Sequence, residues 1–251
     1  MSNYFGVNLE FDKNKIDSIV DTCISNNAVG YVCSVDGNNF SIAVKDSNHK
    51  QLLNTAIVNI CDSSWIAVMV NKIYHTDYKE YHGPDLFIDY IKKKKYKQFF
   101  LGSNSNILTA LKDNLSKIDP SIKNMVFMEL PFRKVEEFDY TSIAKIINDN
   151  SPDLVWVSLG CPKQERFMQL LQPYLDRGIM FGIGAAFNFY SGLENAPKRA
   201  PQWMIDNKLE FVYRIFSEPK KQIKRCWRFI KIIPQVYLKE QHQYNLISSA
   251  K

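Results

Sequence analysis

Short apolar runs that alternate with longer amphipathic segments constrain the fold of this chain more than any other feature. Six runs rich in β-branched or aromatic residues predict strands, at residues 28–35, 56–61, 98–101, 125–128, 154–159 and 179–183. Five segments between them carry apolar residues at helical spacing and predict helices, at residues 47–55, 84–95, 107–115, 140–150 and 165–175. Such alternation is typical of a mostly parallel sheet with helices on both faces. We therefore predict an α/β fold with a Rossmann-like sheet.

The chain changes character near residue 196, where basic and aromatic residues become frequent. Pro197, Pro201 and Pro219 punctuate a helical pattern there. We predict an α/β domain over residues 1–195. Residues 196–251 are predicted to form a basic helical appendage rather than a second independent domain.

Cationic and apolar side chains recur within the appendage at the spacing of one helix. The cationic series is Lys221, Lys224, Arg225 and Arg228, and the apolar series is Ile223, Trp227 and Ile230. A basic amphipathic helix of this kind suits an anionic membrane surface, and arginine suits a diphosphate group. The alternative is a solvated helix whose Ile/Trp face packs on the core. The sequence leaves both interpretations open.

Composition limits the classes of protein and of partner. The net charge of +6 favours anionic partners such as a nucleotide diphosphate or an anionic membrane. No run of about eighteen apolar residues predicts a transmembrane helix, and the N-terminus does not resemble a secretory signal. The five cysteines are scattered without a Cys-x-x-Cys pair, and the four histidines are not closely spaced. We expect a cytoplasmic protein with reduced thiols and no metal site.

A first glycine-containing turn follows the predicted strand at residues 98–101. From Gly102 to Asn106, small polar residues precede a helix, whose free backbone amides suit an anion. The alternative is an ordinary strand-to-helix turn, since no complete Gly-x-Gly-x-x-Gly is present.

A second turn carries more polar groups. Gly160 is followed by Lys163, Gln164 and Glu165 in the first turn of a predicted helix, at the sheet edge where ligands bind. Lys163 suits a phosphate or a sugar carboxylate, and Gln164 suits a uracil or a sugar hydroxyl. Glu165 suits ribose hydroxyls, or alternatively only complements the helix dipole.

Four blocks of sequence resemble one known family. They read Pro-Asp-Leu-Val-Trp-Val-Ser-Leu-Gly-Cys-Pro-Lys-Gln-Glu at 152–165, Phe-Gly-Ile-Gly-Ala-Ala-Phe-Asn-Phe at 181–189, Lys-Arg-Ala-Pro-Gln-Trp-Met at 198–204 and Leu-Glu-Phe-Val-Tyr-Arg at 209–214. In this order they are similar to the motifs of the WecG/TagA/CpsF glycosyltransferases, which build bacterial surface polysaccharides on a lipid carrier. The resemblance covers nearly the whole chain and is strongest over residues 153–225.

This resemblance implies a reaction and its partners. It implies an inverting transferase that moves a sugar from a UDP-sugar to a polyprenyl-diphosphate-linked saccharide, as a peripheral protein on the inner face of the bacterial membrane. The chain contains no Asp-x-Asp triplet, which fits a transferase that needs no metal cofactor. A homo-oligomer is possible under the resemblance, and no nucleic acid is expected.

The resemblance also implies catalytic residues after the first two predicted strands. Asp62 matches the family's proposed base, although the Asp-Gly pair of the family is Asp62-Ser63 here. Counting back without a gap aligns the family's Thr-x-Asn with Ser34 and Asp36, whereas a slipped alignment restores the amide at Asn38 or Asn39. By this resemblance Ser34 is catalytic together with Asp62, whereas Asp36 and Asn39 bind substrate. For Asp62 the alternative is a helix cap or a turn residue.

Further substrate-binding residues follow from the matched blocks. Gly83 and Asp85 open a helix that lines the active site in the family, although Asp85 is equally interpretable as a helix-start carboxylate. Gly184 permits close approach of a ligand, and Asn188 replaces a frequent Asp, so this amide can bind a sugar but cannot act as a base. The resemblance finally implies substrate contacts for two arginines, Arg199 and Arg214.

Two alternative functions belong to other classes of protein. The basic aromatic tail is compatible with a non-catalytic module that binds nucleic acid or lipid, but such a module leaves Asp62 and the Lys-Gln-Glu turn unexplained. A nicotinamide-dependent dehydrogenase is disfavoured because its dinucleotide fingerprint is missing. The sequence identifies neither the transferred sugar nor the acceptor glycan.

Overall fold

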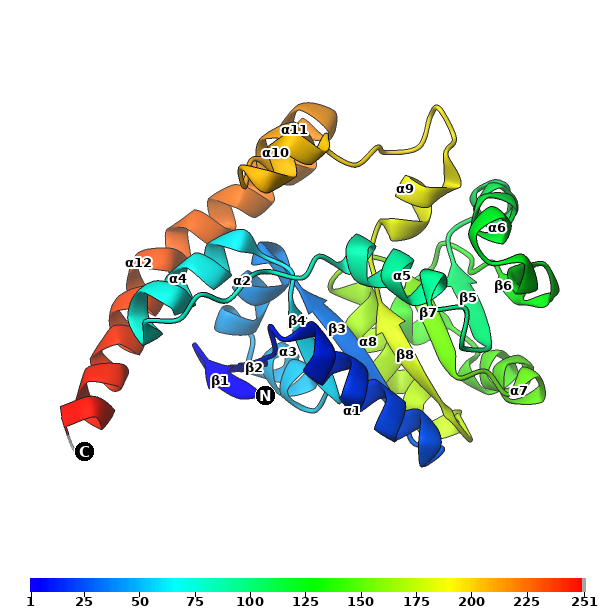
Figure 1. The fold of residues 1–251 in the computed structure, drawn as a ribbon, viewed down its shortest axis with the longest axis horizontal. Coiled ribbons are helices and arrows are strands. Elements are labelled where there is room, and N and C mark those ends of the chain that lie inside the picture. The colour runs from blue at the N-terminus through cyan, green and yellow to red at the C-terminus, as the bar shows by residue number, and fades with distance from the viewer. Residues whose placement is uncertain (250–251) are drawn as a thin grey trace.

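A single sheet of six parallel strands forms the centre of the molecule, for which a computed structural model describes residues 1–249 (Figure 1). In sheet order the strands are β4 (Val58–Cys61), β3 (Val29–Val35), β8 (Gly178–Gly182), β7 (Leu154–Ser158), β5 (Gln98–Gly102) and β6 (Val126–Met128). All neighbouring strands run parallel, so their carboxyl ends share one edge. All six predicted strands are confirmed, with ends shifted by one or two residues.

Helices cover both faces of this sheet, as predicted (Figure 1). One face carries α2 (Gly37–Lys45), α3 (Ser47–Asn54), α4 (Ser64–Tyr74), α7 (Tyr140–Asn150) and α8 (Lys163–Leu171). The other carries α1 (Lys13–Ser25), α5 (Gly83–Lys92), α6 (Ser105–Ile118) and α9 (Ala186–Ser191). Side chains alternate between the faces within a strand: Val155 and Val157 of β7 pack on the first, and Leu154 and Trp156 on the second.

Within residues 1–249, four α-helices and an N-terminal hairpin have no counterpart in the sequence analysis. They are α1, α2, α4, α9 and an N-terminal hairpin of β1 (Ser2–Tyr4) and β2 (Val7–Leu9). The hairpin strands contain three residues each, which is too short for a periodic pattern to stand out. Pairing of the two strands with each other, rather than a periodic pattern, therefore defines the hairpin.

The appendage consists of α10 (Gln202–Asp206), α11 (Glu210–Ser217) and α12 (Pro219–Ser249). Figure 1 shows α12 running along α2 and α4. Ile232 is buried against the core, and Tyr74 Oη donates a hydrogen bond to Glu240 Oε1 at 2.7 Å. Within residues 1–249, no helix combines the length and the apolar character required to cross a bilayer.

The face of α12 that packs on the core is not the one with the predicted Ile/Trp series. Ile223, Trp227 and Ile230 are 56%, 59% and 55% exposed. Phe229 and Ile233 lie on the adjacent face of the helix and contact the core instead. The interpretation that the Ile/Trp face packs on the core is therefore wrong.

Candidate active site

The carboxyl ends of β3 and β4 open into a cleft of about 370 Å³ that the appendage closes on its far side. Asp36 and Asp62 follow these two strands and line the inner wall. Arg214 of α11 and Arg225 of α12 line the opposite wall. The structure thus brings together two sets of predicted residues that lie more than 150 positions apart in the sequence.

Asp62 lies where β4 meets β3 and the start of α5. Gly83 N donates to Asp62 Oδ2 at 3.1 Å, and His82 Nδ1 lies 2.9 Å from Asp62 Oδ1. A Cβ on Gly83 would lie only 2.8 Å from Ser34 Oγ, so the predicted Ser34, Asp62 and Gly83 all meet here. Ser63 caps α4 through its hydroxyl, so the interpretation of Asp62 as the cap of that helix is wrong.

His82 is a member of this site that the sequence analysis missed. Burial alone lowers the pKa of a histidine, but the hydrogen bond and charge of Asp62, together with the charges of Glu210 and Glu80, raise the pKa of His82 to about 9. His82 is therefore an imidazolium at neutral pH. Its position directly before the Gly83-Pro84-Asp85 block was the only signal in the sequence.

Asp36 presents a second carboxylate to the cleft. Asp36 Oδ1 accepts from Asn39 N at 2.7 Å and caps α2. Burial and the charge of Asp62 raise the pKa of Asp36, while Arg225 and Arg214 oppose that rise. The cleft therefore combines the neighbouring carboxylates of Asp36 and Asp62 with two arginines, of which Arg214 also pairs with Glu210 of α11 at 3.4 Å.

Asn39 and Glu165 lie in the interior rather than at the surface of the site. Both are fully buried, and Asn39 Nδ2 donates to Glu165 Oε1 at 3.1 Å. His49 Nε2 lies 2.6 Å from Asn39 Oδ1 on the other side. Burial raises the pKa of Glu165 to about 7, against the hydrogen bond from Gln164. The prediction that Asn39 and Glu165 contact substrate is corrected, because neither has exposed surface.

Gln164 is also buried, and its amide is used inside the protein. Gln164 Oε1 accepts from Gly160 N at 3.2 Å and from Gly184 N at 3.0 Å. It thereby joins the turns that follow β7 and β8, where both glycines have positive φ and an added Cβ would meet only open space. The predicted sugar or uracil contact of Gln164 is corrected to this internal role, whereas Gly160 and Gly184 remain at the sheet edge. Asn188 follows in α9 and is half-buried.

The turn after β5 is closed by the protein itself. Gly102 has a φ of +114°, and an added Cβ would lie 2.6 Å from the Ser158 carbonyl oxygen, so this position requires glycine. Asn104 caps α6, and Ser105 N donates to Glu129 Oε2 at 3.0 Å. A carboxylate of the protein thus accepts a hydrogen bond from a backbone amide at the start of this helix. This contact favours the ordinary turn over the predicted anion site.

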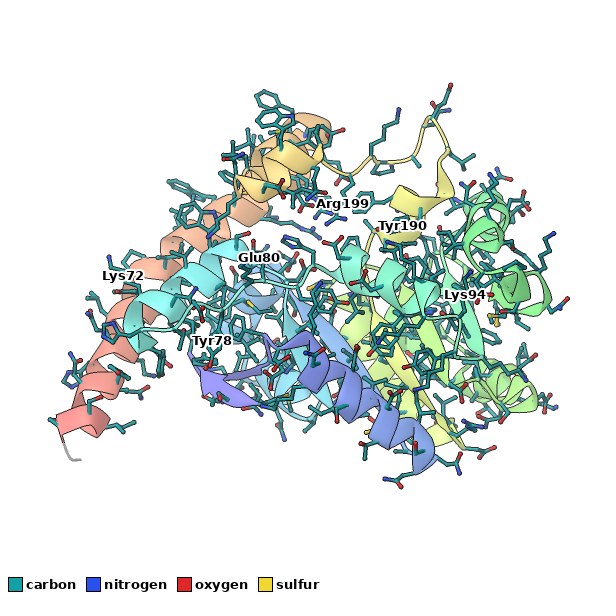
Figure 2. The ribbon with its side chains drawn as sticks, viewed as in Figure 1. Lys72, Tyr78, Glu80, Lys94, Tyr190 and Arg199 are labelled. Atoms are coloured by element: carbon teal, nitrogen blue, oxygen red, sulfur yellow. The ribbon has the colours of Figure 1, made fainter. Side chains whose placement is uncertain are left out.

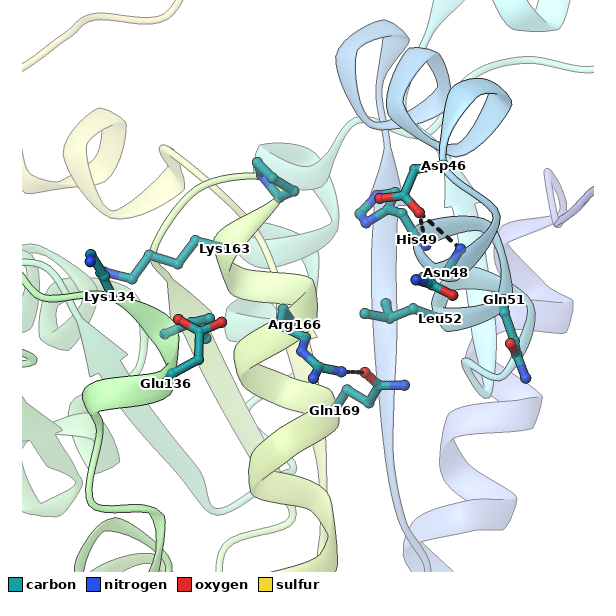
Figure 3. A pocket seen from close by; sticks show the side chains of 12 residues that line it. Asp46, Asn48, His49, Gln51, Leu52, Lys134, Glu136, Lys163, Arg166 and Gln169 are labelled. Carbon is teal, nitrogen blue, oxygen red and sulfur yellow. Dashed lines mark hydrogen bonds between the residues drawn. The ribbon is translucent and has the colours of Figure 1, made fainter.

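Lys163 extends along the surface beside the loop that follows β6. Its Nζ donates to the Arg133 carbonyl oxygen and lies 5.4 Å from the ring centroid of Phe132, which is fully exposed. Figure 3 shows Lys163 and Lys134 on one side of an open groove of about 840 Å³, with Asp46 and His49 on the other side. An exposed aromatic ring beside a lysine is a suitable surface for the nucleobase and a phosphate group of a nucleotide.

Arg199 and Asp85, both predicted to bind substrate, bind one another. Two guanidinium nitrogens of Arg199 donate to the two carboxylate oxygens of Asp85, each at 2.5 Å. Figure 2 shows Arg199 below the appendage helices, with Tyr190 of α9 nearby. This pair ties the segment between α9 and α10 to the start of α5.

The four predicted cations of α12 divide into two pairs. Arg225 lines the cleft, and Arg228 Nη1 donates to Asn38 Oδ1 at 3.0 Å. Lys221 and Lys224 point outward on the exposed side, where Lys221 also pairs with Glu218 at 3.0 Å. Among residues 1–249, no three His, Cys, Asp or Glu side chains are grouped so as to hold a metal ion.

Comparisons with known proteins cover most of the chain. A family model described as "Glycosyl transferase WecG/TagA/CpsF family" matches residues 3–245. The chain is 27% identical over 199 residues to the N-acetylglucosaminyldiphosphoundecaprenol N-acetyl-beta-D-mannosaminyltransferase of Bacillus subtilis (strain 168), covering 78% of the chain and 73% of the relative. The protein of the same name from Bacillus spizizenii (strain ATCC 23059 / NRRL B-14472 / W23) is 26% identical, over 77% of the chain and 71% of the relative. The one from Staphylococcus aureus (strain MW2) is 22% identical, over 68% of the chain and 65% of the relative.

Proposed function

The chain belongs to the glycosyl transferase WecG/TagA/CpsF family, and on this premise we propose that it is an inverting glycosyltransferase. It moves a sugar from a UDP-sugar to a saccharide linked to polyprenyl diphosphate, during synthesis of a bacterial surface polysaccharide. One observation supports this proposal above the others: Asp62 is held at the inner wall of a cleft whose outer wall carries Arg214 and Arg225.

Inversion requires a single displacement at the anomeric carbon. Asp62 accepts the proton of the acceptor hydroxyl as that oxygen attacks, in the manner of a general base. The bond from the anomeric carbon to the β-phosphate oxygen breaks, and its electron pair leaves with UDP. Both Asp62 oxygens already accept hydrogen bonds from the protein, which orients the carboxylate before substrate binds.

Cationic side chains of the appendage stabilise the charges of this reaction. Arg214, Arg225 and Lys208 line the cleft opposite the two carboxylates. Fixed cations of this kind stabilise the charge that develops on a leaving diphosphate, so we propose that no metal cofactor is needed. They equally suit the diphosphate of a lipid-linked acceptor, and the names of the relatives specify N-acetylglucosaminyldiphosphoundecaprenol as such a substrate.

The surface beyond the cleft supports attachment to a membrane. Trp227 and Ile230 are exposed on α12 next to Lys224, and Ile230 also lines the cleft mouth. Such a mixture of aromatic, aliphatic and basic side chains suits the interface of an anionic bilayer. We propose a peripheral protein on the inner face of the cell membrane. A nucleic-acid-binding module is disfavoured by the carboxylates Asp36 and Asp62 in the cationic cleft.

The decisive experiment is a donor screen with the purified full chain. A panel of UDP-sugars is combined with a short polyprenyl-diphosphate N-acetylglucosamine acceptor, and released UDP is measured. We expect release that depends on both substrates, and product of inverted anomeric configuration by NMR. Absence of transfer from every donor would overturn the proposed function.

Asp62→Asn tests the base. The change preserves shape and removes the basic oxygen, so we expect UDP binding to persist while turnover falls by about 10²–10⁴-fold. Asp113→Asn is the matched control, because Asp113 is exposed on α6 away from the cleft. Turnover of Asp62→Asn near the wild-type rate excludes Asp62 as the base.

A further inference from the structure

His82 occupies a position between acidic groups from three elements. Its Nδ1 lies 2.9 Å from Asp62 Oδ1, and its Nε2 lies 3.9 Å from Glu80 Oε1. The charge of Glu210 in α11 also raises the pKa of His82. The charge of Lys208 lowers the pKa of Glu80. The His82 side chain is only 13% exposed, and it lines the cleft.

Hydrogen bonds made by Glu80 and Asp62 fix the two carboxylates on either side of the His82 ring. Ser64 Oγ donates to Glu80 Oε1 at 2.6 Å, so Glu80 is itself held in place. The adjacent Gly83 N donates to Asp62 Oδ2, so one dipeptide engages both oxygens of the same carboxylate. Because Nδ1 faces Asp62, the proton on this nitrogen is donated toward the proposed base.

We propose that His82 is a positioning residue for sugar transfer, which acts through Asp62 as an imidazolium. It fixes the orientation of the Asp62 carboxylate and places a positive charge beside it when the acceptor hydroxyl arrives. The inference rests on the proposed function and extends it. The raised pKa of His82 means that the cation persists through neutral pH.

Charge is conserved through the step as follows. Before transfer, Asp62 and His82 form a pair with no net charge. The proton of the acceptor hydroxyl passes to Asp62 as the new glycosidic bond forms and the bond to the β-phosphate breaks. The positive charge of His82 is then no longer neutralised by Asp62, while negative charge has developed on the departing diphosphate. Charges of opposite sign thus increase together within the cleft.

Kinetics of His82 variants test the positioning role. His82→Asn retains a neutral donor near Asp62, whereas His82→Ala removes both the donor and the charge. We expect kcat/KM to fall by about 10²-fold in His82→Ala and less in His82→Asn, with UDP affinity within twofold of wild type. In the wild type, kcat/KM should fall as His82 loses its proton near pH 9, and this alkaline limb should be missing from both variants, which a purely structural defect does not produce.

His75→Asn is the matched control. His75 is exposed and ends α4 with a φ of 56°, a conformation that asparagine accepts readily. It should behave as wild type in every assay. If His82→Ala and His82→Asn both keep wild-type turnover and the wild-type alkaline limb, the positioning role is wrong.

An NMR titration separates this inference from the proposed function, because it requires no sugar transfer. The His82 ring signals, assigned by comparison with His82→Asn, should titrate near pH 9 in the wild type and markedly lower in Asp62→Asn. Transfer without this coupling overturns the role of His82 alone. Coupling without transfer from any donor overturns the proposed function, and the role of His82 fails with it.

Discussion

Replacing Gly83 by alanine should slow sugar transfer by about tenfold or more without unfolding the protein. An added Cβ would lie 2.8 Å from Ser34 Oγ and 3.2 Å from Asp62 Oδ2, whereas ordinary van der Waals contact begins at 3.4 Å. Ser34 can relieve the closer contact only by rotating its hydroxyl out of the site. Asp62 must also move, although Gly83 N holds the same oxygen at 3.1 Å.

The expected magnitude follows from these distances. Since a misplacement of about 1 Å costs roughly 10²-fold in rate, displacements of several tenths of an ångström should cost about tenfold or more in kcat/KM. Gly83 begins α5 and does not have a positive φ, so alanine fits the backbone. The smaller entropy of the unfolded chain contributes about 0.4–1 kcal/mol of stability, which offsets part of the steric cost.

A double-mutant cycle with Ser34→Ala measures whether the clash is the cause. Removing Ser34 Oγ abolishes the 2.8 Å contact, so Gly83→Ala should cost less in the Ser34→Ala background than in wild type. UDP release and thermal unfolding would be followed for all four proteins. Wild-type turnover of Gly83→Ala, or strictly additive effects of the two substitutions, would refute this reasoning.

Two further predictions concern the membrane surface and a buried carboxyl group. Trp227→Ser combined with Ile230→Ser should reduce co-sedimentation with anionic liposomes and leave thermal unfolding unchanged, because both side chains are more than half exposed; equal liposome binding contradicts the membrane surface. Glu165→Gln should be more stable than wild type at pH 8 but not at pH 4. Burial raises the pKa of Glu165 from 4.5 to about 7, so between these pH values the folded wild type binds a proton that the unfolded chain does not. The wild type therefore loses on the order of 3 kcal/mol of folding stability as pH rises through that range. Urea unfolding at both pH values measures this difference, and a pH-independent difference would disprove the cause.

The sheet was predictable because each buried strand leaves a direct trace in the sequence. Leu154 to Ser158 is buried on both faces and reads as a continuous apolar run, as parallel strands do. Asp62 was predictable for a related reason, since a polar residue directly after such a run lies at the carboxyl edge. Local pattern and topology therefore suffice for these features.

Partnerships between distant residues were not predictable. Arg199 and Asp85 each matched a motif, but nothing in either motif shows that they neutralise one another across 114 positions. Asn39 likewise donates a hydrogen bond to Glu165 in the interior, across 126 positions. The packed face of α12 could not be assigned from the sequence, because Phe229 and Ile233 recur at the same i, i+4 spacing as Ile223 and Trp227.

Gln164 couples the rigidity of two loops at the carboxyl edge of the sheet. One oxygen accepts the amides of both Gly160 and Gly184, so the loops after β7 and β8 are fastened to each other as well as to their own strands. Neither loop can open by itself without leaving that oxygen half satisfied. Rigidity at this edge is therefore collective, and any ligand held by one loop is supported by the stiffness of both.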